Sequence, residues 1–216
     1  MSLELKKRII TSFFLFSLLL LMFHFSFILV ITIIIIAIIN WIEFYALLSK
    51  IFKKNNIKQK IYRFLGKAFS LFYLIALVFL IFLNFEQKNY IFFILSVSIA
   101  SDIGGLTIGR IFKGKKLSKI SPNKTISGSI GSFIFSLSLI PIFYEQLIIV
   151  NIYSLILFTF LISLITQLGD LFISFLKRKA HVKNTSDLLP GHGGFLDRTD
   201  GIIFAVPLGI LLLSFF

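Results

Sequence analysis

The chain alternates between long apolar runs and short polar segments, and the runs lack the strict alternation that marks a β-strand. A helix needs about 20 apolar residues to cross a hydrocarbon core of about 30 Å. The first run, from Ile9 to Leu48, would form a single helix of about 60 Å. We therefore expect two helices there, joined by a turn near His24–Ser26, with His24 as an interfacial turn residue and not a ligand.

Five further runs have about the length of a membrane span. We place them at about 68–84, 90–109, 126–144, 147–168 and 201–216. A membrane β-barrel would show alternating segments of about ten residues, and the sequence contains none. The predicted fold class is therefore all-α, a polytopic membrane bundle of about seven transmembrane helices.

The charged residues lie between the apolar runs, and they are strongly unequal in sign. The chain has 22 Lys and Arg against 9 Asp and Glu, a formal net charge of +13. With seven spans, every Lys and Arg except Lys88 falls on the side of the N-terminus, in segments 1–8, 50–67, 110–125 and 169–200. Cytoplasmic segments of membrane proteins are rich in these residues. We therefore expect a bacterial cytoplasmic membrane, a cytoplasmic N-terminus and a cytoplasmic active site.

The amino-acid composition limits which partners the protein can bind and which side-chain chemistry it can use. Cysteine is absent, which excludes disulfides, thiolate nucleophiles and thiolate metal sites. In a membrane protein, an excess of positive charge suits anionic headgroups or an anionic substrate. We expect anionic membrane lipids as partners and no nucleic acid.

The longest polar stretch runs from Ser174 to Asp200 and gathers cations, carboxylates and glycines. Carboxylates without His or Cys partners favour a hard cation such as Mg²⁺, and the candidates are Asp170, Asp197 and Asp200. The glycines at 191, 193 and 194 allow positive φ and close backbone approach, and exposed backbone N–H groups there can hold phosphate oxygens. Charge-assisted bonds to phosphate are available from Lys177, Arg178, Lys183 and Arg198. The pattern favours phosphate transfer over a transporter site or a dock for anionic lipid, which both stay open.

Two carboxylates lie elsewhere, beside or within apolar runs. Glu43 is either a functional acid or an interfacial residue in an aromatic belt with Trp41 and Tyr45, and the sequence does not decide between these. Asp102 lies near the end of its run, by our topology near the cytoplasmic interface.

The start of the run at 126–144 carries local helix signals. Thr125 or Ser127 is expected to cap this helix. Gly128 and Gly131 are expected to let it pack closely on a neighbour.

The spacing of the polar residues resembles the phosphatidate cytidylyltransferase (CDP-diacylglycerol synthase) family. Its C-terminal signature is matched in register by Ser174, Lys177, Arg178, Lys183, Pro190, His192, Gly193, Gly194, Asp197, Arg198 and Asp200. Upstream family segments are similar to Asp102, Gly104, Gly109 and Arg110, then to Ser121, Pro122, Lys124, Thr125 and Gly128, and then to Gln167, Gly169 and Asp170. The resemblance covers roughly residues 98–216, with weaker similarity around Glu43.

Some positions depart from the family pattern. Asn184 stands where the family has Asp, Ser127 where it usually has Glu, and Gly105-Leu106 where it has Ala-Tyr. The lost carboxylates are expected to alter the handling of metal or lipid. The chain is also short for the family, so some of its N-terminal spans are expected to be absent.

The resemblance implies a Mg²⁺-dependent nucleotidyltransferase that converts CTP and phosphatidate into CDP-diacylglycerol and pyrophosphate. It implies that Asp170 and Asp197 bind Mg²⁺, with Asp200 beside them. The phosphates would be neutralised by Lys177, Arg178, Lys183 and Arg198. The substrate site would be completed by Asp102, Lys124, Thr125, Gly193 and Gly194, with His192 orienting the turn or bonding a phosphate.

The same resemblance suggests how the chain is organised and what else it could be. Residues 1–97 would be a scaffold and residues 98–216 the catalytic region, within one integral membrane domain. A second cation and a homodimer are compatible with it. The alternatives are a CTP-using enzyme on another lipid, such as archaeol phosphate, a polyprenol or phytol kinase, or a non-catalytic lipid-binding or transport homologue.

Overall fold

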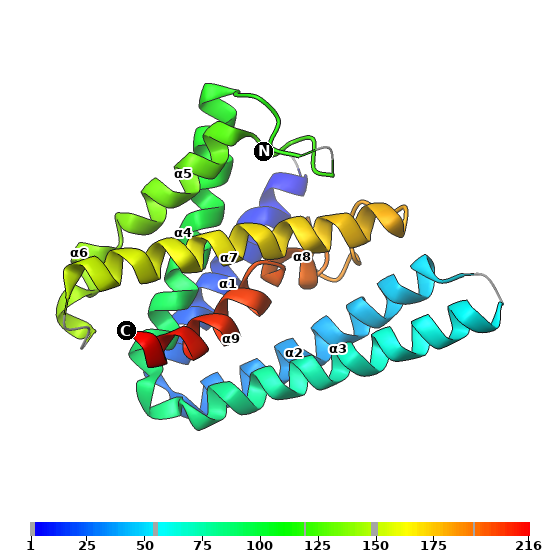
Figure 1. Ribbon diagram of the computed structural model, residues 1–216, viewed down its shortest axis with the longest axis horizontal. Helices are drawn as coiled ribbons and strands as arrows, with labels where there is room; N and C mark the ends of the chain where they lie inside the picture. Colours follow the sequence, from blue (N-terminus) through cyan, green and yellow to red (C-terminus); the bar gives the residue numbers. More distant parts are fainter. Residues whose placement is uncertain (1–2, 54–55, 119, 148–150, 192) are drawn as a thin grey trace. The chain divides into compact units, whose positions relative to one another are not determined.

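The computed structural model describes residues 3–53, 56–118, 120–147, 151–191 and 193–216. Within these residues the chain is helical, without a strand (Figure 1). The helices are α1 Leu3–His24, α2 Ser26–Ile51, α3 Ile57–Leu83, α4 Lys88–Phe112, α5 Ile126–Leu137, α6 Ile140–Phe143, α7 Ile152–Lys179, α8 Leu196–Thr199 and α9 Ile202–Leu212. Short 3₁₀ turns follow α3, α6 and α9 at Phe85–Gln87, Tyr144–Gln146 and Leu213–Phe215. The predicted all-α class is confirmed.

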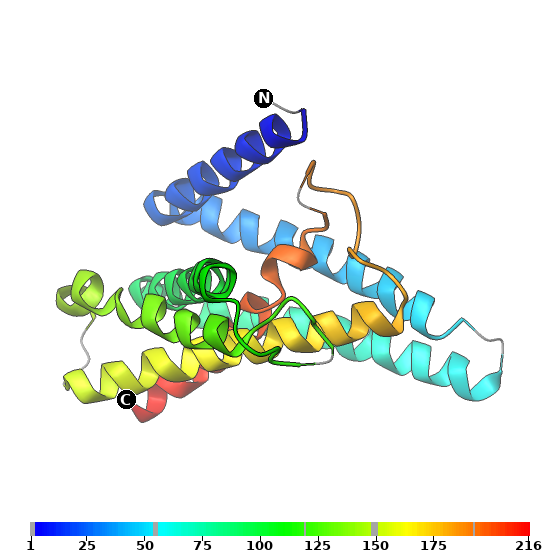
Figure 2. The same ribbon diagram turned by 90° about the horizontal axis from the view of Figure 1, so that it is seen from above.

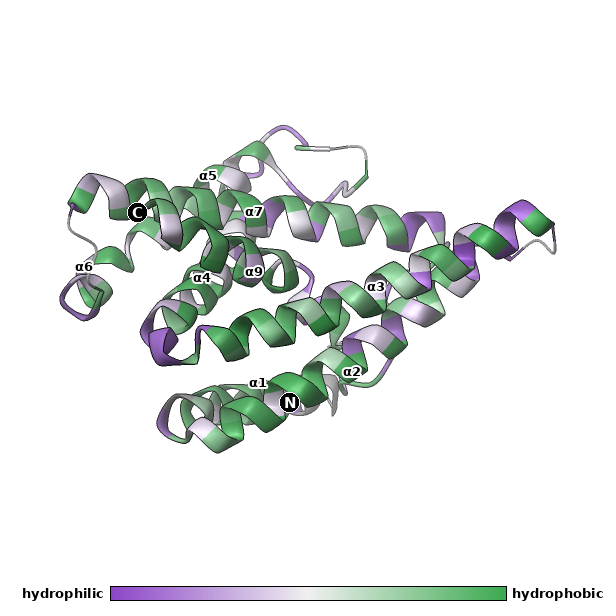
Figure 3. Ribbon diagram, turned by 60° about the horizontal axis from the view of Figure 1, so that its bottom comes forward, coloured by the Kyte–Doolittle hydropathy of each residue, from purple (hydrophilic) through white to green (hydrophobic). Residues whose placement is uncertain are grey.

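Among the residues that the structure describes, six helical segments are long and apolar enough to cross a membrane. They are Ser26–Ile51, Ile57–Leu83, Phe85–Phe112, Ile126–Gln146, Ile152–Lys179 and Leu196–Phe215. The apolar stretch Ile9–Met22 in α1 is shorter, so the predicted number of about seven corresponds to six full-length spans and this shorter one. The long helices are mostly hydrophobic in Figure 3, and hydrophilic residues gather where α2 and α3 are joined.

The first apolar run folds as the predicted hairpin. Helix α1 ends at His24 and α2 begins at Ser26, with Phe25 in an extended conformation between them. The side chain of His24 is exposed, in agreement with its interpretation as a turn residue.

Two helices extend into polar sequence beyond the predicted spans. Helix α3 begins at Ile57, so much of the basic segment before residue 68 is helical. Helix α7 continues past Leu168 to Lys179, beyond the predicted span at about 147–168. Leu, Ile, Phe, Lys and Arg follow Gly169 without any proline, and a helix propagates easily through such residues.

The run at 126–144 is interrupted instead of forming one continuous helix. Helix α5 ends at Leu137, and the one-turn helix α6 begins at Ile140 with Pro141 in its first turn. Proline has no N–H to donate to the preceding turn, and its ring clashes there. The break therefore follows from Pro141.

The chain forms two compact units, one of Met1–Phe82 with Leu176–Thr199 and the other of Leu83–Phe175 with Asp200–Phe216. The predicted division between residues 97 and 98 concerns sequence resemblance and stays a prediction.

In the first unit, α2 runs beside α3 (Figure 1). Lys67 Nζ lies 3.2 Å from the centroid of the Tyr45 ring, and a Cβ atom at Gly66 would lie 3.1 Å from Leu48 Cδ1. The buried side chains of α2 include the polar residues Asn40 and Glu43. They are three residues apart and so share one face of the helix.

In the second unit, α4 and α5 lie side by side (Figure 2). Their contact is so close that a Cβ atom at Gly131 would collide with Ile108. This confirms the close packing predicted for that glycine. Hydroxyl groups also link α4 to α7, through Ser101 and Ser163 at 3.0 Å between their Oγ atoms.

Candidate active site

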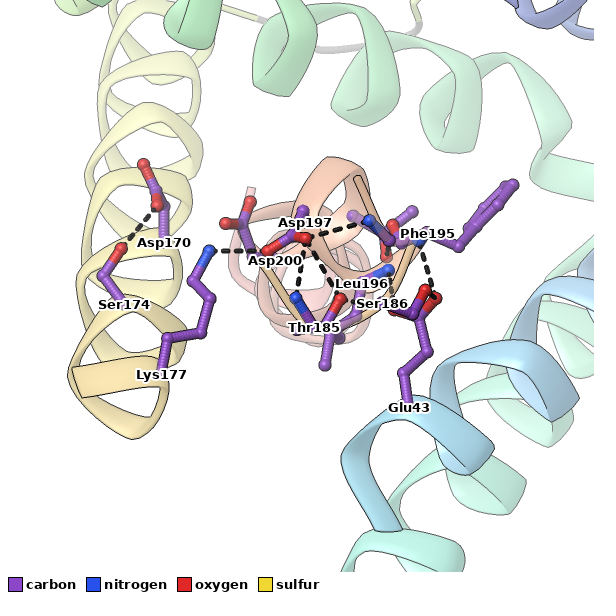
Figure 4. A network of polar contacts seen from close by, with 12 residues as sticks. Glu43, Asp170, Ser174, Lys177, Thr185, Ser186, Phe195, Leu196, Asp197 and Asp200 are labelled. Carbon is purple, nitrogen blue, oxygen red and sulfur yellow. Dashed lines mark hydrogen bonds and ion pairs between the residues drawn. The ribbon is translucent and has the colours of Figure 1, made fainter. Parts of the chain in front are cut away.

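Asp197 is the centre of a buried polar network in the first unit (Figure 4). Lys177 Nζ donates to Asp197 Oδ1 at 2.8 Å, and the two side chains are 12% and 7% exposed. Asp197 Oδ2 accepts from the backbone N–H groups of Thr185 at 2.9 Å and Gly194 at 3.0 Å. The Thr185 hydroxyl lies 3.1 Å from the same oxygen. The carboxylate is thereby fixed by both charge and backbone.

The turn after α7 leads the chain into this network. The N–H of Val182 donates to the carbonyl of Lys177, and the N–H of His181 donates to that of Arg178. These bonds are those of a Schellman motif, in which the left-handed residue is usually glycine. Here His181 takes that conformation, with φ of 56°.

The glycine turn has the backbone conformation that the sequence predicted. Gly191 and Gly193 have φ values of 77° and 83°, which glycine adopts without steric cost. The N–H of Leu189 closes the turn by donating to the carbonyl of Gly193 at 2.8 Å. Gly194 was expected to offer a backbone donor to phosphate, and in this structure its N–H is donated to Asp197.

Glu43 lies at the same network, on α2. Its side chain is buried inside the protein, with an exposure of 2%, which favours the first of its two interpretations, a functional acid. Its carboxylate accepts from the hydroxyls of Thr185 and Ser186, each at 2.6 Å. It also accepts from the backbone N–H groups of Phe195 at 2.9 Å and Leu196 at 2.8 Å. The sequence signal was only an acid within an apolar run.

In the second unit, Asp170 on α7 forms an ion pair with Lys124, and both side chains are 24% exposed. The hydroxyl of Ser174, one turn later, donates to Asp170 Oδ1 at 3.3 Å. The second predicted metal ligand therefore also faces a lysine of the family pattern.

The loop before α5 holds Lys124 in place. The N–H of Leu117 donates to the carbonyl of Lys124 at 2.8 Å. Of the two predicted N-cap candidates, Thr125 caps the helix, and its hydroxyl accepts from Gly128 N–H at 3.0 Å. Ser127, which replaces the family's Glu, accepts from Gly114 N–H at 3.2 Å.

Asp200 lies at the start of the segment that leads into α9. It is 6% exposed, and its Oδ1 accepts from Gly201 N–H at 3.0 Å. A Cβ atom at Gly169 would lie 3.0 Å from the carbonyl oxygen of Asp200. The second unit therefore brings the backbone of Asp200 against the residue that precedes Asp170. Asp102 lies on α4 and is half-buried.

The remaining predicted cations are exposed, and they are Arg178, Lys183 and Arg198. Asn184, which replaces the family's Asp, is exposed as well. A Cβ atom at Gly193 would lie 3.1 Å from Asn184 Cγ and 3.0 Å from Asp197 Oδ2. Asn184 and Asp197 therefore flank the same glycine. His192 lies outside the described residues.

The carboxylates offer a donor set of the kind that Mg²⁺ takes. Among the described residues, no three side chains of His, Cys, Asp or Glu gather closely enough to form a metal site alone. Mg²⁺ is commonly held by one or two carboxylates together with substrate phosphates and water. Asp170 and Asp197 fit that requirement by their chemistry.

The fold and the site define a helical, multi-pass membrane protein with aspartate–lysine pairs in its polar segments. The chain belongs to the cytidylyltransferase family, whose model matches residues 3–216. The predicted resemblance is confirmed, and the match extends beyond the region from residue 98 onward.

The chain is similar to proteins named phosphatidate cytidylyltransferase in several bacteria. Identity is 42% over 138 residues to that of Bacillus subtilis, covering 62% of this chain and 51% of the relative. Identity to the protein of Staphylococcus saprophyticus is 35% over 179 residues, which cover 80% of this chain and 66% of the relative. Identity to the protein of Rickettsia typhi is 41% over 142 residues, which cover 59% of this chain and 60% of the relative. The chain spans about half the length of the first of these relatives.

Proposed function

We propose that this protein transfers the cytidylyl group of CTP to phosphatidate, giving CDP-diacylglycerol and pyrophosphate. The observation that carries the proposal is the pairing of Asp197 with Lys177 and of Asp170 with Lys124. These are four positions of the family pattern, and each carboxylate faces a cation of that pattern. The family membership and the names of the relatives support the same activity.

The reaction is a displacement at the α-phosphorus of CTP. A phosphate oxygen of phosphatidate forms the new O–P bond, and the bond from the α-phosphorus to the bridging oxygen breaks, so that pyrophosphate leaves with the electron pair. The attacking oxygen is already an anion near neutral pH and needs little help from a general base. The barrier comes from charge repulsion and alignment, which fixed cations lower.

Asp170 and Asp197 would hold Mg²⁺, with Asp200 beside them. When bound, the ion would neutralise phosphate charge and favour departure of pyrophosphate. A cation on the carboxylates would leave the ammonium groups of Lys124 and Lys177 available to phosphate oxygens, because lysine is a flexible point charge.

The other cations and the membrane orientation complete the proposal. The exposed cations Arg178, Lys183 and Arg198 would bind the triphosphate and the lipid phosphate. We place these segments and the N-terminus on the cytoplasmic side, since nearly all Lys and Arg lie in the segments of one side.

Radiolabelled CTP tests the activity. Purified protein in mixed micelles with phosphatidate and Mg²⁺ should move the α-label of CTP into lipid and release pyrophosphate. Transfer of the γ-label to a polyprenol or phytol would indicate a kinase, and turnover of archaeol phosphate alone would indicate another lipid substrate. Binding of phosphatidate without pyrophosphate release would indicate a non-catalytic homologue and refute the proposal.

A further inference from the structure

We propose that Glu43 is a positioning residue of the active site, which holds the loop that fixes Asp197. The inference rests on the proposed function, because it assigns Asp197 a part in that reaction. The inference deepens the proposed function, because it gives the N-terminal helices a part in the same site. The sequence predicts only a scaffold role for these helices.

Burial of Glu43 is the first observation. An uncompensated carboxylate inside a membrane helix is costly, and a carboxylate has acceptor sites for about four hydrogen bonds. Glu43 receives four of them, from Thr185, Ser186, Phe195 and Leu196. The burial of its carboxylate is therefore compensated by one loop alone.

The four donors come from two segments between α7 and Asp197, which we call the two arms of the loop. The first arm contains Thr185 and Ser186, and the second contains Gly194, Phe195 and Leu196. Oε2 accepts from Thr185 on the first arm and Leu196 on the second. Oε1 accepts from Ser186 on the first arm and Phe195 on the second. Each oxygen therefore joins the two arms, and Glu43 acts as their cross-link (Figure 4).

The cross-linked arms supply the donors that hold Asp197. Asp197 Oδ2 accepts from Thr185 N–H on the first arm and from Gly194 N–H on the second. The Thr185 hydroxyl lies 2.6 Å from Glu43 Oε2 and 3.1 Å from Asp197 Oδ2. Separation of the arms would therefore move the Thr185 N–H and hydroxyl away from Asp197, while Gly194, three residues before Asp197, would stay with it.

The packing leaves little room around this arrangement. A Cβ atom at Gly194 would collide with the Thr185 hydroxyl and the Glu43 carboxylate. Helix α1 adds a further contact, since Thr11 Oγ1 donates to the carbonyl of Pro190 at 3.1 Å. The loop is thus held by both helices of the N-terminal hairpin.

Thr199 provides a matched control on the same pair of elements. Its hydroxyl donates to Asn40 Oδ1 at 3.0 Å, and Asn40 lies one turn before Glu43 on α2. Like the bonds of Glu43, this buried bond joins α2 to the segment that follows α7. Unlike Thr185, however, neither Thr199 nor Asn40 donates to Asp197. A purely structural role for the Thr185–Glu43 link would make the two links equivalent. Because the Thr185 hydroxyl also lies 3.1 Å from Asp197 Oδ2, Glu43→Gln is needed to test the carboxylate itself.

The test compares Thr185→Val, Thr185→Ser and Thr199→Val in the full chain. Valine removes the hydroxyl at either site, and serine at 185 restores it. The first readout is cytidylyl transfer with its dependence on Mg²⁺. The second is binding of Mn²⁺, as a probe for Mg²⁺, by electron paramagnetic resonance without substrates. Thermal unfolding in detergent reports the structural effect of each change.

We expect Thr185→Val to weaken Mn²⁺ binding or lower turnover by about 10- to 100-fold, as for other residues that orient a metal ligand. Thr185→Ser should recover most of this loss. Thr199→Val should lower the unfolding temperature by a similar amount and retain turnover and Mn²⁺ binding. Equal losses in the two valine variants, in proportion to their stability, would overturn the inference.

Glu43→Gln extends the test and separates it from the proposed function. Glutamine has one carbonyl oxygen and places an amide donor against N–H and O–H donors, so its effect should exceed that of Thr185→Val. If the wild-type protein shows no transfer, the proposed function fails, and Mn²⁺ binding alone still decides the role of Glu43. If the wild type is active and Glu43→Gln matches it, only the inference fails.

Discussion

Lys177 and Asp197 are 20 residues apart in the chain, and Lys177 Nζ donates to Asp197 Oδ1 at 2.8 Å. The lysine lies in the last turn of α7 and the aspartate in α8. Together with the two N–H groups on Asp197 Oδ2, this ion pair fixes the carboxylate that we assign to Mg²⁺. The relationship predicts distinct outcomes for changes to the carboxylate, the cation and the glycine turn.

Asp197→Asn should abolish Mg²⁺-dependent transfer. Asparagine is neutral and has one carbonyl oxygen, so it loses both the charge and one acceptor. Residues that merely orient a metal ligand cost about 10- to 100-fold when changed, and the ligand itself should cost at least about 100-fold. The measurement is formation of CDP-lipid over a Mg²⁺ titration. Asp187→Asn, an exposed carboxylate of the same segment, should retain activity, and wild-type turnover of Asp197→Asn would refute the metal assignment.

Lys177→Met should destabilise the protein as well as inactivate it. Methionine keeps much of the length of lysine but leaves the Asp197 charge with neutral donors only. Breaking a buried ion pair costs about 3–5 kcal/mol when the remaining charge is uncompensated. Because three neutral contacts to Asp197 persist, we expect a loss of about 2 kcal/mol.

Thermal unfolding in detergent measures this loss, and added Mg²⁺ should recover part of it. Lys179→Met is the comparison, since Lys179 is an exposed lysine of the same helix end. Similar unfolding temperatures for the two variants would mean that the Lys177–Asp197 pair contributes little to stability.

Gly194→Ala should disable the site without altering any charge. The added methyl group would collide with the Thr185 hydroxyl and the Glu43 carboxylate. Relief requires Thr185 and Glu43 to move away from residue 194, which would take the Thr185 N–H and hydroxyl from Asp197. We expect at least a tenfold loss of turnover, on the order of that for other residues that orient a metal ligand. Gly66→Ala should be tolerated, since its methyl group would meet only the flexible end of Leu48. A fully active Gly194→Ala variant would show that the loop can open without cost.

Short-range patterns in the sequence predicted much of this site. Thr125 was a candidate N-cap because its hydroxyl precedes an apolar run, and it accepts the N–H of Gly128 as expected. The glycine turn was predicted from composition, and Gly191 and Gly193 have positive φ. Each of these features depends on neighbouring residues, which a sequence pattern contains.

Long-range contacts were not predictable in the same way. Glu43 and Thr185 are 142 residues apart, and no local pattern indicates that a membrane helix carries the acceptor for a distant loop. The turn at His181 was missed because a left-handed helix end is normally marked by glycine. The hydropathy pattern does not indicate that α7 continues through Asp170, because polar residues after an apolar run are typical of the end of a span.

Asn184→Asp should strengthen the response to Mg²⁺. Asn184 and Asp197 flank Gly193, with Asn184 Cγ and Asp197 Oδ2 at 3.1 Å and 3.0 Å from the position of a Cβ atom on that glycine. A carboxylate at 184 would restore the residue of the family pattern and add negative charge beside Asp197. Attraction between this charge and a divalent cation should lower the Mg²⁺ concentration for half-maximal activity by several-fold, which corresponds to about 1 kcal/mol.

The Mg²⁺ titration of transfer activity measures this shift, and Asn184→Ser serves as a neutral control. Added salt should reduce the difference between the Asp and Ser variants, because the site is partly exposed and screening weakens its charges. An unchanged half-maximal concentration in Asn184→Asp would mean that residue 184 does not act on the cation.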